Sequence, residues 1–191
     1  MGRSAESLIG AVLCGGESRR MGRDKGLIQR NGICWAAWMG RKLLPWELPV
    51  AFSIRAEQEQ RYSAVMPAAC FVTDTMDGAG PLNGLLSVHR QFPERDILLL
   101  GCDMLDLDEA TIGELISVYR AETGAGCYHY RDNEQVQPLC AIYTASGFKQ
   151  AGDEVGPVRS LRGLIQRMQV NSLEIKRAEA FRNYNSPDGA G

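Results

Sequence analysis

Short apolar runs alternate along the chain with longer segments in which apolar side chains recur every three or four residues. The runs have the length and continuity of buried parallel strands, which are covered on both faces. The expected strands are residues 8–14, 50–54, 70–73, 97–100, 125–130 and 136–143. The amphipathic segments predict helices over residues 34–44, 82–89, 112–119 and 160–168, and residues 57–65 are expected to form a polar surface helix. This alternation predicts an α/β sandwich around a mostly parallel sheet.

Local signals refine the boundaries of these elements. Asn31-Gly32 is a hairpin signal between residues 27–28 and 33–34, Pro45 is expected to end the first helix, and Asp108 is expected to cap a later one. Trp35, Trp38 and Trp46 cluster around the first helix. We interpret these rings as core rather than as a ligand stack, since aromatic side chains at helical spacing usually pack.

The first strand runs directly into a segment that cannot continue it. Residues 15–25 hold three glycines, four cationic side chains and Ser18. Glycines let backbone N–H groups approach an anion, and nearby Arg and Lys side chains neutralise phosphate charge. The segment lacks the Gly-Lys-Ser/Thr ending of a P-loop and the G-x-G-x-x-G spacing of a dinucleotide fold. It therefore predicts a phosphate-holding loop of another kind.

Composition limits the possible functions. The 191 residues suit one domain, residues 1–191, and the net charge of −2 argues against a general nucleic-acid binder. No apolar run approaches the length of a membrane span, and the polar first residues do not resemble a signal peptide. The cysteines are interpreted as reduced and mostly core, without a zinc site: 14, 34, 70, 102, 127 and 140. We expect a cytoplasmic protein. Neither His89 nor His129 is expected to be a catalytic residue.

Residues 13–25 resemble the Leu-Ala-Gly-Gly-x-Ser-x-Arg-Met-Gly-x-Asp-Lys signature of the molybdenum cofactor guanylyltransferases, with Cys14 in place of alanine. The resemblance implies the Rossmann-like three-layer fold of the nucleotide-diphospho-sugar transferases, with one antiparallel strand in the sheet. It also implies a nucleotide site in this loop. The implied nucleotide contacts are Leu13, Cys14, Gly15, Gly16, Ser18, Arg19 and Lys25. Arg19 and Lys25 are expected to hold the β- and γ-phosphates during catalysis.

Three further blocks extend the resemblance over essentially the whole chain. Residues 74–87 resemble the family's Asp…Gly-Pro-Leu-x-Gly-Leu-x-Ser segment and place Asp74, Gly80, Pro81, Leu82 and Gly84 in the nucleotide site. Ser53 stands where the family has an asparagine that contacts the nucleotide. Cys102-Asp103 matches the start of Cys-Asp-x-Pro, with Leu105 replacing the proline, and makes Asp103 the expected Mg²⁺ ligand and a catalytic residue. The ending at residues 181–188 assigns Asn183 and Asn185 to the pocket of the second substrate.

Taken together, the resemblance implies transfer of GMP from GTP to molybdenum-bound molybdopterin, with Mg²⁺ as cofactor and pyrophosphate as product. Gly16 favours guanine over cytosine, because the cytidine relatives resemble Ala-Ala-Gly here. Two alternatives stay open: a molybdopterin cytidylyltransferase and a non-catalytic nucleotide-binding partner in molybdoenzyme maturation. Proteins that deliver molybdopterin or assemble molybdoenzymes are possible partners, and neither nucleic acid nor membrane is expected.

Overall fold

The computed structural model describes residues 7–14, 24–74, 80–152 and 158–184. Within these residues a seven-stranded sheet runs in the order β5-β4-β1-β6-β8-β7-β9. The strands are β1 (Leu8–Leu13), β4 (Val50–Ile54), β5 (Cys70–Thr73), β6 (Asp96–Gly101), β7 (Cys127–Asp132), β8 (Gln135–Tyr143) and β9 (Val170–Glu174). Strand β8 is antiparallel to β6 and β7, and the other neighbours are parallel. The predicted sheet, with one antiparallel strand, is confirmed.

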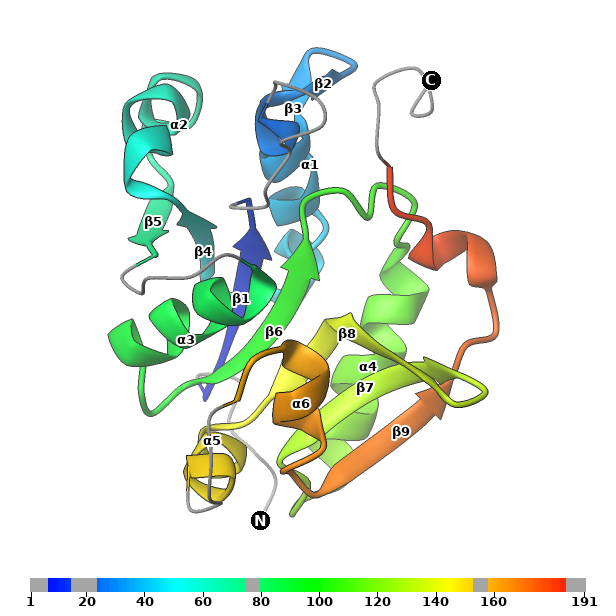
Figure 1. Cartoon of the computed structure of the whole chain (residues 1–191). Coiled ribbons are helices and arrows are strands. Elements are labelled where there is room, and N and C mark those ends of the chain that lie inside the picture. The colour runs from blue at the N-terminus through cyan, green and yellow to red at the C-terminus, as the bar shows by residue number, and fades with distance from the viewer. Residues whose placement is uncertain (1–6, 15–23, 75–79, 153–157, 185–191) are drawn as a thin grey trace.

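Helices cover both faces of the sheet (Figure 1). One face is packed by α1 (Trp35–Arg41) and α4 (Glu109–Ala121), and the other by α3 (Pro81–Gln91), α5 (Ala145–Gly152) and α6 (Leu161–Ile165). Helix α2 (Glu59–Val65) precedes β5. Each face has its own apolar core, because the continuous runs of β1 and β6 bury side chains on both sides. Among the described residues, no helix combines the length and the apolar character that crossing a membrane requires.

The local signals of the sequence are confirmed at several places. Strands β2 (Gln29–Arg30) and β3 (Ile33–Cys34) form an antiparallel hairpin in which Asn31 and Gly32 have φ of 52° and 77°. Such positive angles suit a two-residue turn of the Asn-Gly type. Asp108 caps α4 by accepting a hydrogen bond from the Thr111 N–H at 2.7 Å. Trp35 is fully buried in the core, as expected of packed tryptophan.

Some predicted boundaries were wrong. The first helix ends at Arg41 rather than residue 44, because the N–H groups of Lys42 and Leu43 bond three residues back, to the Met39 and Gly40 carbonyls, in a tighter turn. Residues Leu44–Trp46 form a separate 3₁₀ turn. The first hairpin strand is Gln29–Arg30 rather than residues 27–28. Helix α6 stops at Ile165, and the N–H groups of Arg167 and Met168 bond three residues back in a tighter turn.

Two elements were not predicted. Strand β9 lies at the edge of the sheet, where only Leu173 of its five residues is buried, so it carries no apolar run. Helix α5 buries Gly147, Phe148 and Ala151, and its small residues give a weak helical pattern. In the predicted face of α3, His89 is half-buried and stacks on Phe148 at 3.9 Å between ring centroids, while Val88 takes the buried position.

Candidate active site

The candidate site lies where the carboxyl ends of β4, β1 and β6 meet. Backbone hydrogen bonds continue the pairing of these strands by one residue past their ends. The Cys14 N–H donates to the Ser53 carbonyl at 2.9 Å, and the Cys102 N–H donates to the Leu13 carbonyl at 3.1 Å. Ligands of open α/β sheets bind beyond the carboxyl ends of the strands. The predicted site residues Lys25, Asp74 and Asp103 come after β1, β5 and β6 in the chain, and the parallel order β5-β4-β1-β6 brings the carboxyl ends of these strands to one edge of the sheet (Figure 1).

Lys25 and Asp103 meet across this edge. The Lys25 Nζ donates to Asp103 Oδ2 at 3.1 Å, although the two residues lie far apart in the chain. About a fifth of each side chain is exposed, so the pair is partly shielded and still open to a ligand. A site for a metal-bound triphosphate requires both kinds of group. The cation donates hydrogen bonds to phosphate oxygens, and the carboxylate is a ligand for a hard metal ion.

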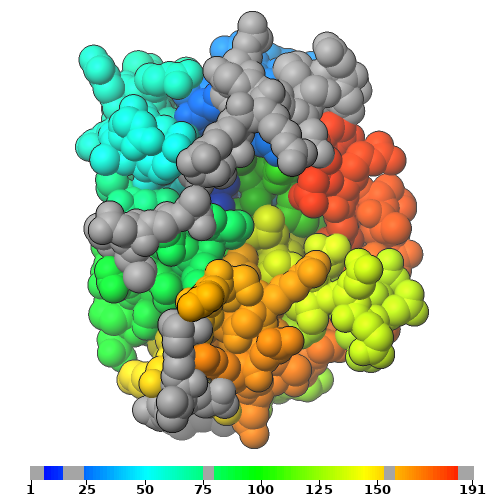
Figure 2. All heavy atoms as spheres, in the orientation of Figure 1, coloured from blue at the N-terminus to red at the C-terminus, as the bar shows by residue number. Residues whose placement is uncertain are grey.

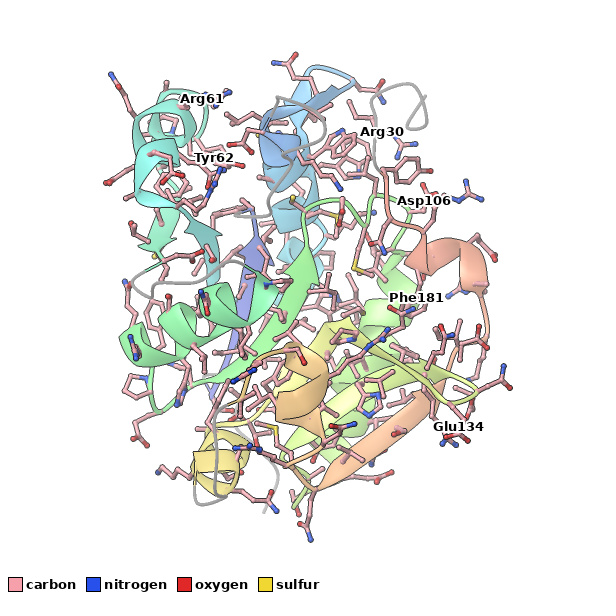
Figure 3. The ribbon with its side chains drawn as sticks, viewed as in Figure 1. Arg30, Arg61, Tyr62, Asp106, Glu134 and Phe181 are labelled. Carbon is pink, nitrogen blue, oxygen red and sulfur yellow. The ribbon has the colours of Figure 1, made fainter. Side chains whose placement is uncertain are left out.

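Asp24 fixes the turn that carries Lys25, and the sequence reading gave it no role. Its Oδ1 accepts hydrogen bonds from the Gly26 N–H at 3.2 Å and the Tyr62 hydroxyl at 2.7 Å, and its Oδ2 accepts one from Gln58 Nε2 at 2.6 Å. Gly26 must be glycine, because a Cβ there would lie 2.2 Å from the Tyr62 oxygen. Burial raises the pKa of Tyr62, so its hydroxyl stays protonated and donates. Figure 3 shows Tyr62 on α2.

The bond from Tyr62 to Asp24 gives a stability prediction. Tyr62→Phe removes a buried donor to a carboxylate, and we expect the free energy of unfolding to fall by about 1.5–3 kcal/mol, the usual range for a hydrogen bond to a charged group. Tyr143→Phe is the matched control, because the buried Tyr143 hydroxyl donates to the neutral Pro138 carbonyl at 2.8 Å. Its loss should cost about 0.5–1.5 kcal/mol. Equal costs in urea denaturation would contradict a charge-assisted anchor at Asp24.

Ser53 supports Asp74 at the end of the neighbouring strand. The Ser53 side chain is 1% exposed, and its Oγ donates to Asp74 Oδ1 at 2.8 Å. Burial raises the pKa of Asp74, and the Ser53 hydrogen bond opposes this shift. Gly84 of α3 packs directly on this pair, since a Cβ there would lie 2.6 Å from Ser53 Oγ and 2.8 Å from Leu13 Cδ2. The structure thus brings Leu13, Ser53, Asp74 and Gly84 together.

The start of α3 completes this side of the site. Gly80 has φ of 125°, which a residue with a side chain rarely adopts, and Pro81 is the first residue of the helix. Leu82 is buried in the core of that face. Gly84, in the first turn of α3, lies against Ser53, so the start of this helix is on the same side of the site as Asp74.

The C-terminal segment is tied to the Asp103 loop. The Tyr184 N–H donates to the Asp103 carbonyl at 3.0 Å, and the Tyr184 hydroxyl donates to Asp106. Asp106 also faces Arg30 at 3.6 Å and Arg182 at 3.9 Å (Figure 3). Asn183 is exposed within this segment, one residue before the bond to Asp103. The segment predicted to shape the second-substrate pocket therefore lies next to the predicted metal ligand.

Cys14 packs against the turn that carries Lys25, since a Cβ at Gly26 would lie 3.4 Å from Cys14 Cβ. Its side chain is buried, and burial followed by the neighbouring Cys102 thiol raises its pKa well above the ordinary value, so it stays a thiol. The departure from the family's alanine therefore changes packing without adding charge. Leu105, in place of the family's proline, is likewise buried in the core. Five predicted site residues lie outside the described residues, and their roles stay predictions: Gly15, Gly16, Ser18, Arg19 and Asn185.

Among the described residues, no group of three or more His, Cys, Asp or Glu side chains is placed to hold a metal ion by itself. Asp103 offers a carboxylate beside the Lys25 ammonium group just past the end of β6. This donor set fits Mg²⁺, which is usually held by one or two carboxylates together with substrate phosphates and water.

Comparisons with known proteins identify the family and the fold. A family model described as "MobA-like NTP transferase domain" matches residues 10–171. The chain is 33% identical to the probable molybdenum cofactor guanylyltransferase of Opitutus terrae, an alignment that covers 98% of this chain and 95% of the relative. It is 30% identical over 141 residues to a molybdenum cofactor biosynthesis bifunctional protein of Synechocystis, of which it spans 40%. The crystal structure of molybdopterin-guanine dinucleotide biosynthesis protein A from Archaeoglobus fulgidus superposes with a TM-score of 0.75 at 22% identity, covering 95% of this chain and 94% of that one.

Proposed function

Because the chain belongs to the family of MobA-like NTP transferase domains, we propose that it transfers GMP from GTP to molybdenum-bound molybdopterin and releases pyrophosphate. The reaction is that of a nucleotidyltransferase, in keeping with relatives named molybdenum cofactor guanylyltransferase. The observation that carries the proposal is the contact of Lys25 with Asp103 at the carboxyl ends of the strands, within the two most specific blocks of the sequence. We take residues 1–191 as one domain that performs this reaction.

The chain's own groups act by position and charge. Lys25 supplies a cation for the β- and γ-phosphates, where negative charge accumulates as pyrophosphate departs. Arg19 and the glycine-rich loop add donors to the same phosphates. A general base is not required, because a terminal phosphate is already ionised at neutral pH and attacks without losing a proton. Asp24 is held by Gln58 and Tyr62 and in turn fixes the turn that carries Lys25. The backbone of Lys25 is therefore positioned before the substrate binds.

Asp103 is proposed to be the residue that would hold Mg²⁺. The metal supplies Lewis-acid stabilisation of the charge that develops on the reacting phosphate oxygens. Asp103 is well placed for this role, because its backbone is fixed by Tyr184 and its carboxylate lies beside Lys25.

Guanine is proposed to bind between Asp74 and the first turn of α3. A carboxylate accepts hydrogen bonds from the ring N–H and exocyclic amine of guanine, an edge with two adjacent donors that cytosine lacks. The Ser53 hydroxyl donates a hydrogen bond to one oxygen of Asp74 and thereby fixes the orientation of the carboxylate. Ser53 therefore acts through Asp74, and the buried hydroxyl supports the carboxylate where the family has a larger amide.

The proposal predicts a strong preference for GTP. With molybdenum-bound molybdopterin, Mg²⁺ and one nucleotide at a time, GTP should yield the dinucleotide cofactor at least tenfold faster than CTP or ATP. Isothermal titration with each nucleotide tests binding separately from turnover. Faster transfer from CTP would support the cytidylyltransferase instead. Tight GTP binding without any transfer would support a non-catalytic nucleotide-binding protein.

A further inference from the structure

Asp106 joins three segments of the chain beside the candidate site. Its carboxylate accepts a hydrogen bond from the Tyr184 hydroxyl and faces the guanidinium groups of Arg30 and Arg182. Figure 3 shows Asp106 and Arg30 on the same side of the molecule. Neither Asp106 nor Tyr184 is among the site residues predicted from the sequence. Asp106 follows Asp103 by three residues, so its contacts act on the loop that carries the proposed metal ligand.

Apolar side chains hold this loop, residues 102–107 between β6 and α4, in the core. Met104, Leu105 and Leu107 are all nearly inaccessible to solvent. Because apolar burial is not directional, it does not by itself fix the plane of the peptide group at Asp103. The position of the carboxylate is nevertheless narrowly limited, since a Cβ at Gly101 would lie 3.0 Å from Asp103 Oδ1. Directional bonds are therefore needed to orient residue 103.

Tyr184 supplies such bonds at two points of the loop. Its N–H donates to the Asp103 carbonyl at 3.0 Å, and its hydroxyl donates to the Asp106 carboxylate. One residue thus bonds to the loop through its backbone and through the far end of its side chain. Two bonds of this kind fix an orientation as well as a distance. The contact of Tyr184 with Asp106 therefore constrains the peptide group of Asp103.

Tyr184 is itself firmly held. It is 7% exposed, and its ring meets the fully buried Trp35 of α1 edge to face, at 6.3 Å between centroids. Three residues earlier, the buried Phe181 packs on Tyr130 of β7 at 5.0 Å. Figure 2 shows this segment in red, on the surface beside green atoms from the middle of the chain. The bonds of Tyr184 therefore tie the loop to α1 and β7.

The ion pairs of Asp106 are weaker contacts than its bond to Tyr184. Arg30 lies 3.6 Å from the Asp106 carboxylate and also stacks over the Trp38 ring at 5.4 Å. Arg182 lies at 3.9 Å, and 61% of its side chain is exposed. Exposed ion pairs contribute little, whereas a hydroxyl that donates to a carboxylate makes a charge-assisted hydrogen bond. The bond to Tyr184 is therefore the contact through which Asp106 acts on the loop.

We propose that Asp106 is a positioning residue for the transfer reaction: through Tyr184 it fixes the backbone of Asp103, and with it the carboxylate beside Lys25. The proposal rests on the proposed guanylyl transfer for the roles of Asp103 and Lys25. A misplacement of about 1 Å can lower a catalysed rate roughly a hundredfold. Asp106 itself touches no substrate, so its loss should lower kcat and leave the KM for GTP unchanged.

Steady-state transfer of GMP at saturating Mg²⁺ and molybdopterin is the first test. Tyr184→Phe removes the hydroxyl and keeps the ring and the backbone N–H, and it should lower kcat at least tenfold with a KM for GTP within twofold of the wild type. Asp106→Ala should have the same effect, and the double variant should be no slower, because both changes remove one contact. Asp106→Asn keeps an acceptor oxygen for the Tyr184 hydroxyl and should retain kcat within threefold.

Tyr119→Phe is the matched control. The buried Tyr119 hydroxyl donates to Asp96 at 2.7 Å, and Asp96 is the first residue of β6, at the opposite end of that strand from Asp103. This substitution and Tyr184→Phe each take a buried hydroxyl from a carboxylate, so both should lower stability in urea by similar amounts. Tyr119→Phe should leave kcat unchanged. If the wild type is active and both variants keep its kcat, the bond to Asp106 is purely structural and the inference is wrong.

Hydrogen exchange at the amide of residue 184 separates this inference from the proposed function, because it requires no turnover. That amide donates to the Asp103 carbonyl, and it should exchange at least tenfold faster in Asp106→Ala than in the wild type or in Tyr119→Phe. A wild-type exchange rate in Asp106→Ala would mean that Asp106 does not fix Asp103, and would overturn the inference. If this amide responds as expected and the wild type transfers no GMP, the proposed function fails, and the constraint of Asp103 by Asp106 is retained.

Discussion

Asp103→Asn should lower the rate of dinucleotide formation by a factor on the order of 10²–10³ and leave the fold intact. The asparagine has the shape of the aspartate and cannot supply its charge to a divalent cation. A Lewis-acid metal contributes several kcal/mol of transition-state stabilisation, and each 1.36 kcal/mol is about tenfold in rate. The bond from the Tyr184 N–H ends on the backbone carbonyl of residue 103, so this substitution does not remove it.

The measurement is single-turnover formation of the dinucleotide at saturating GTP, with circular dichroism as the folding check. Asp108→Asn is the matched control, since it removes one carboxylate from the same loop and asparagine still caps α4. Asp108 Oδ1 lies 2.9 Å from the guanidinium of the exposed Arg177. A surface ion pair of this kind contributes at most about 1 kcal/mol to stability. Control turnover should stay within twofold of the wild type. Near wild-type turnover in a folded Asp103→Asn protein would mean that the metal is held by other groups.

The convergence of the site was predictable because it follows from strand order. Asp74 and Asp103 each follow an apolar run, and Lys25 follows the first run after a glycine-rich loop. Parallel strands present their carboxyl ends at one edge, so both residues were expected at the nucleotide site; the 3.1 Å contact of Lys25 with Asp103 itself was not predicted. The uninterrupted apolar runs of β1 and β6 predict buried strands clearly, and these two strands lie in the middle of the sheet.

The supports of the site were not predictable in the same way. Tyr62 and Gln58 reach Asp24 only because α2 packs beside the Lys25 turn, and the polar sequence of α2 reads as a solvated surface helix. Strand β9 lies at the edge of the sheet, and its mostly exposed positions carry no apolar pattern that would have revealed it. The bulge at which β8 shifts its pairing with β7 depends on Cys140 at a positive φ, which its sequence does not indicate because cysteine rarely adopts it. Each of these features is set by tertiary contacts rather than by local pattern.

Lys25→Ala should weaken GTP binding by about ten- to a hundredfold and change GMP binding less than threefold. The proposed partner of Lys25 is the β- and γ-phosphates, which GMP lacks, and a charge-assisted hydrogen bond is worth about 1.5–3 kcal/mol. Isothermal titration of both nucleotides in the presence of Mg²⁺ measures the difference. Arg30→Ala is the matched control, because it removes a nearby cation that faces Asp106 at 3.6 Å instead of Asp103.

The ion pair with Asp103 makes a second reading of that result possible, and a double-mutant cycle separates the two. Lys25→Ala also leaves the partly buried carboxylate of Asp103 without the ammonium group that now contacts it. If Lys25 acts only by neutralising Asp103, Lys25→Ala should have no further effect on GTP affinity in an Asp103→Asn background. If Lys25 contacts the phosphates, GTP affinity should fall in that background too, by at least fivefold, while GMP affinity stays level. Equal losses for GTP and GMP in both backgrounds would place Lys25 at the α-phosphate or in the support of the loop, and the assignment to the β- and γ-phosphates would be wrong.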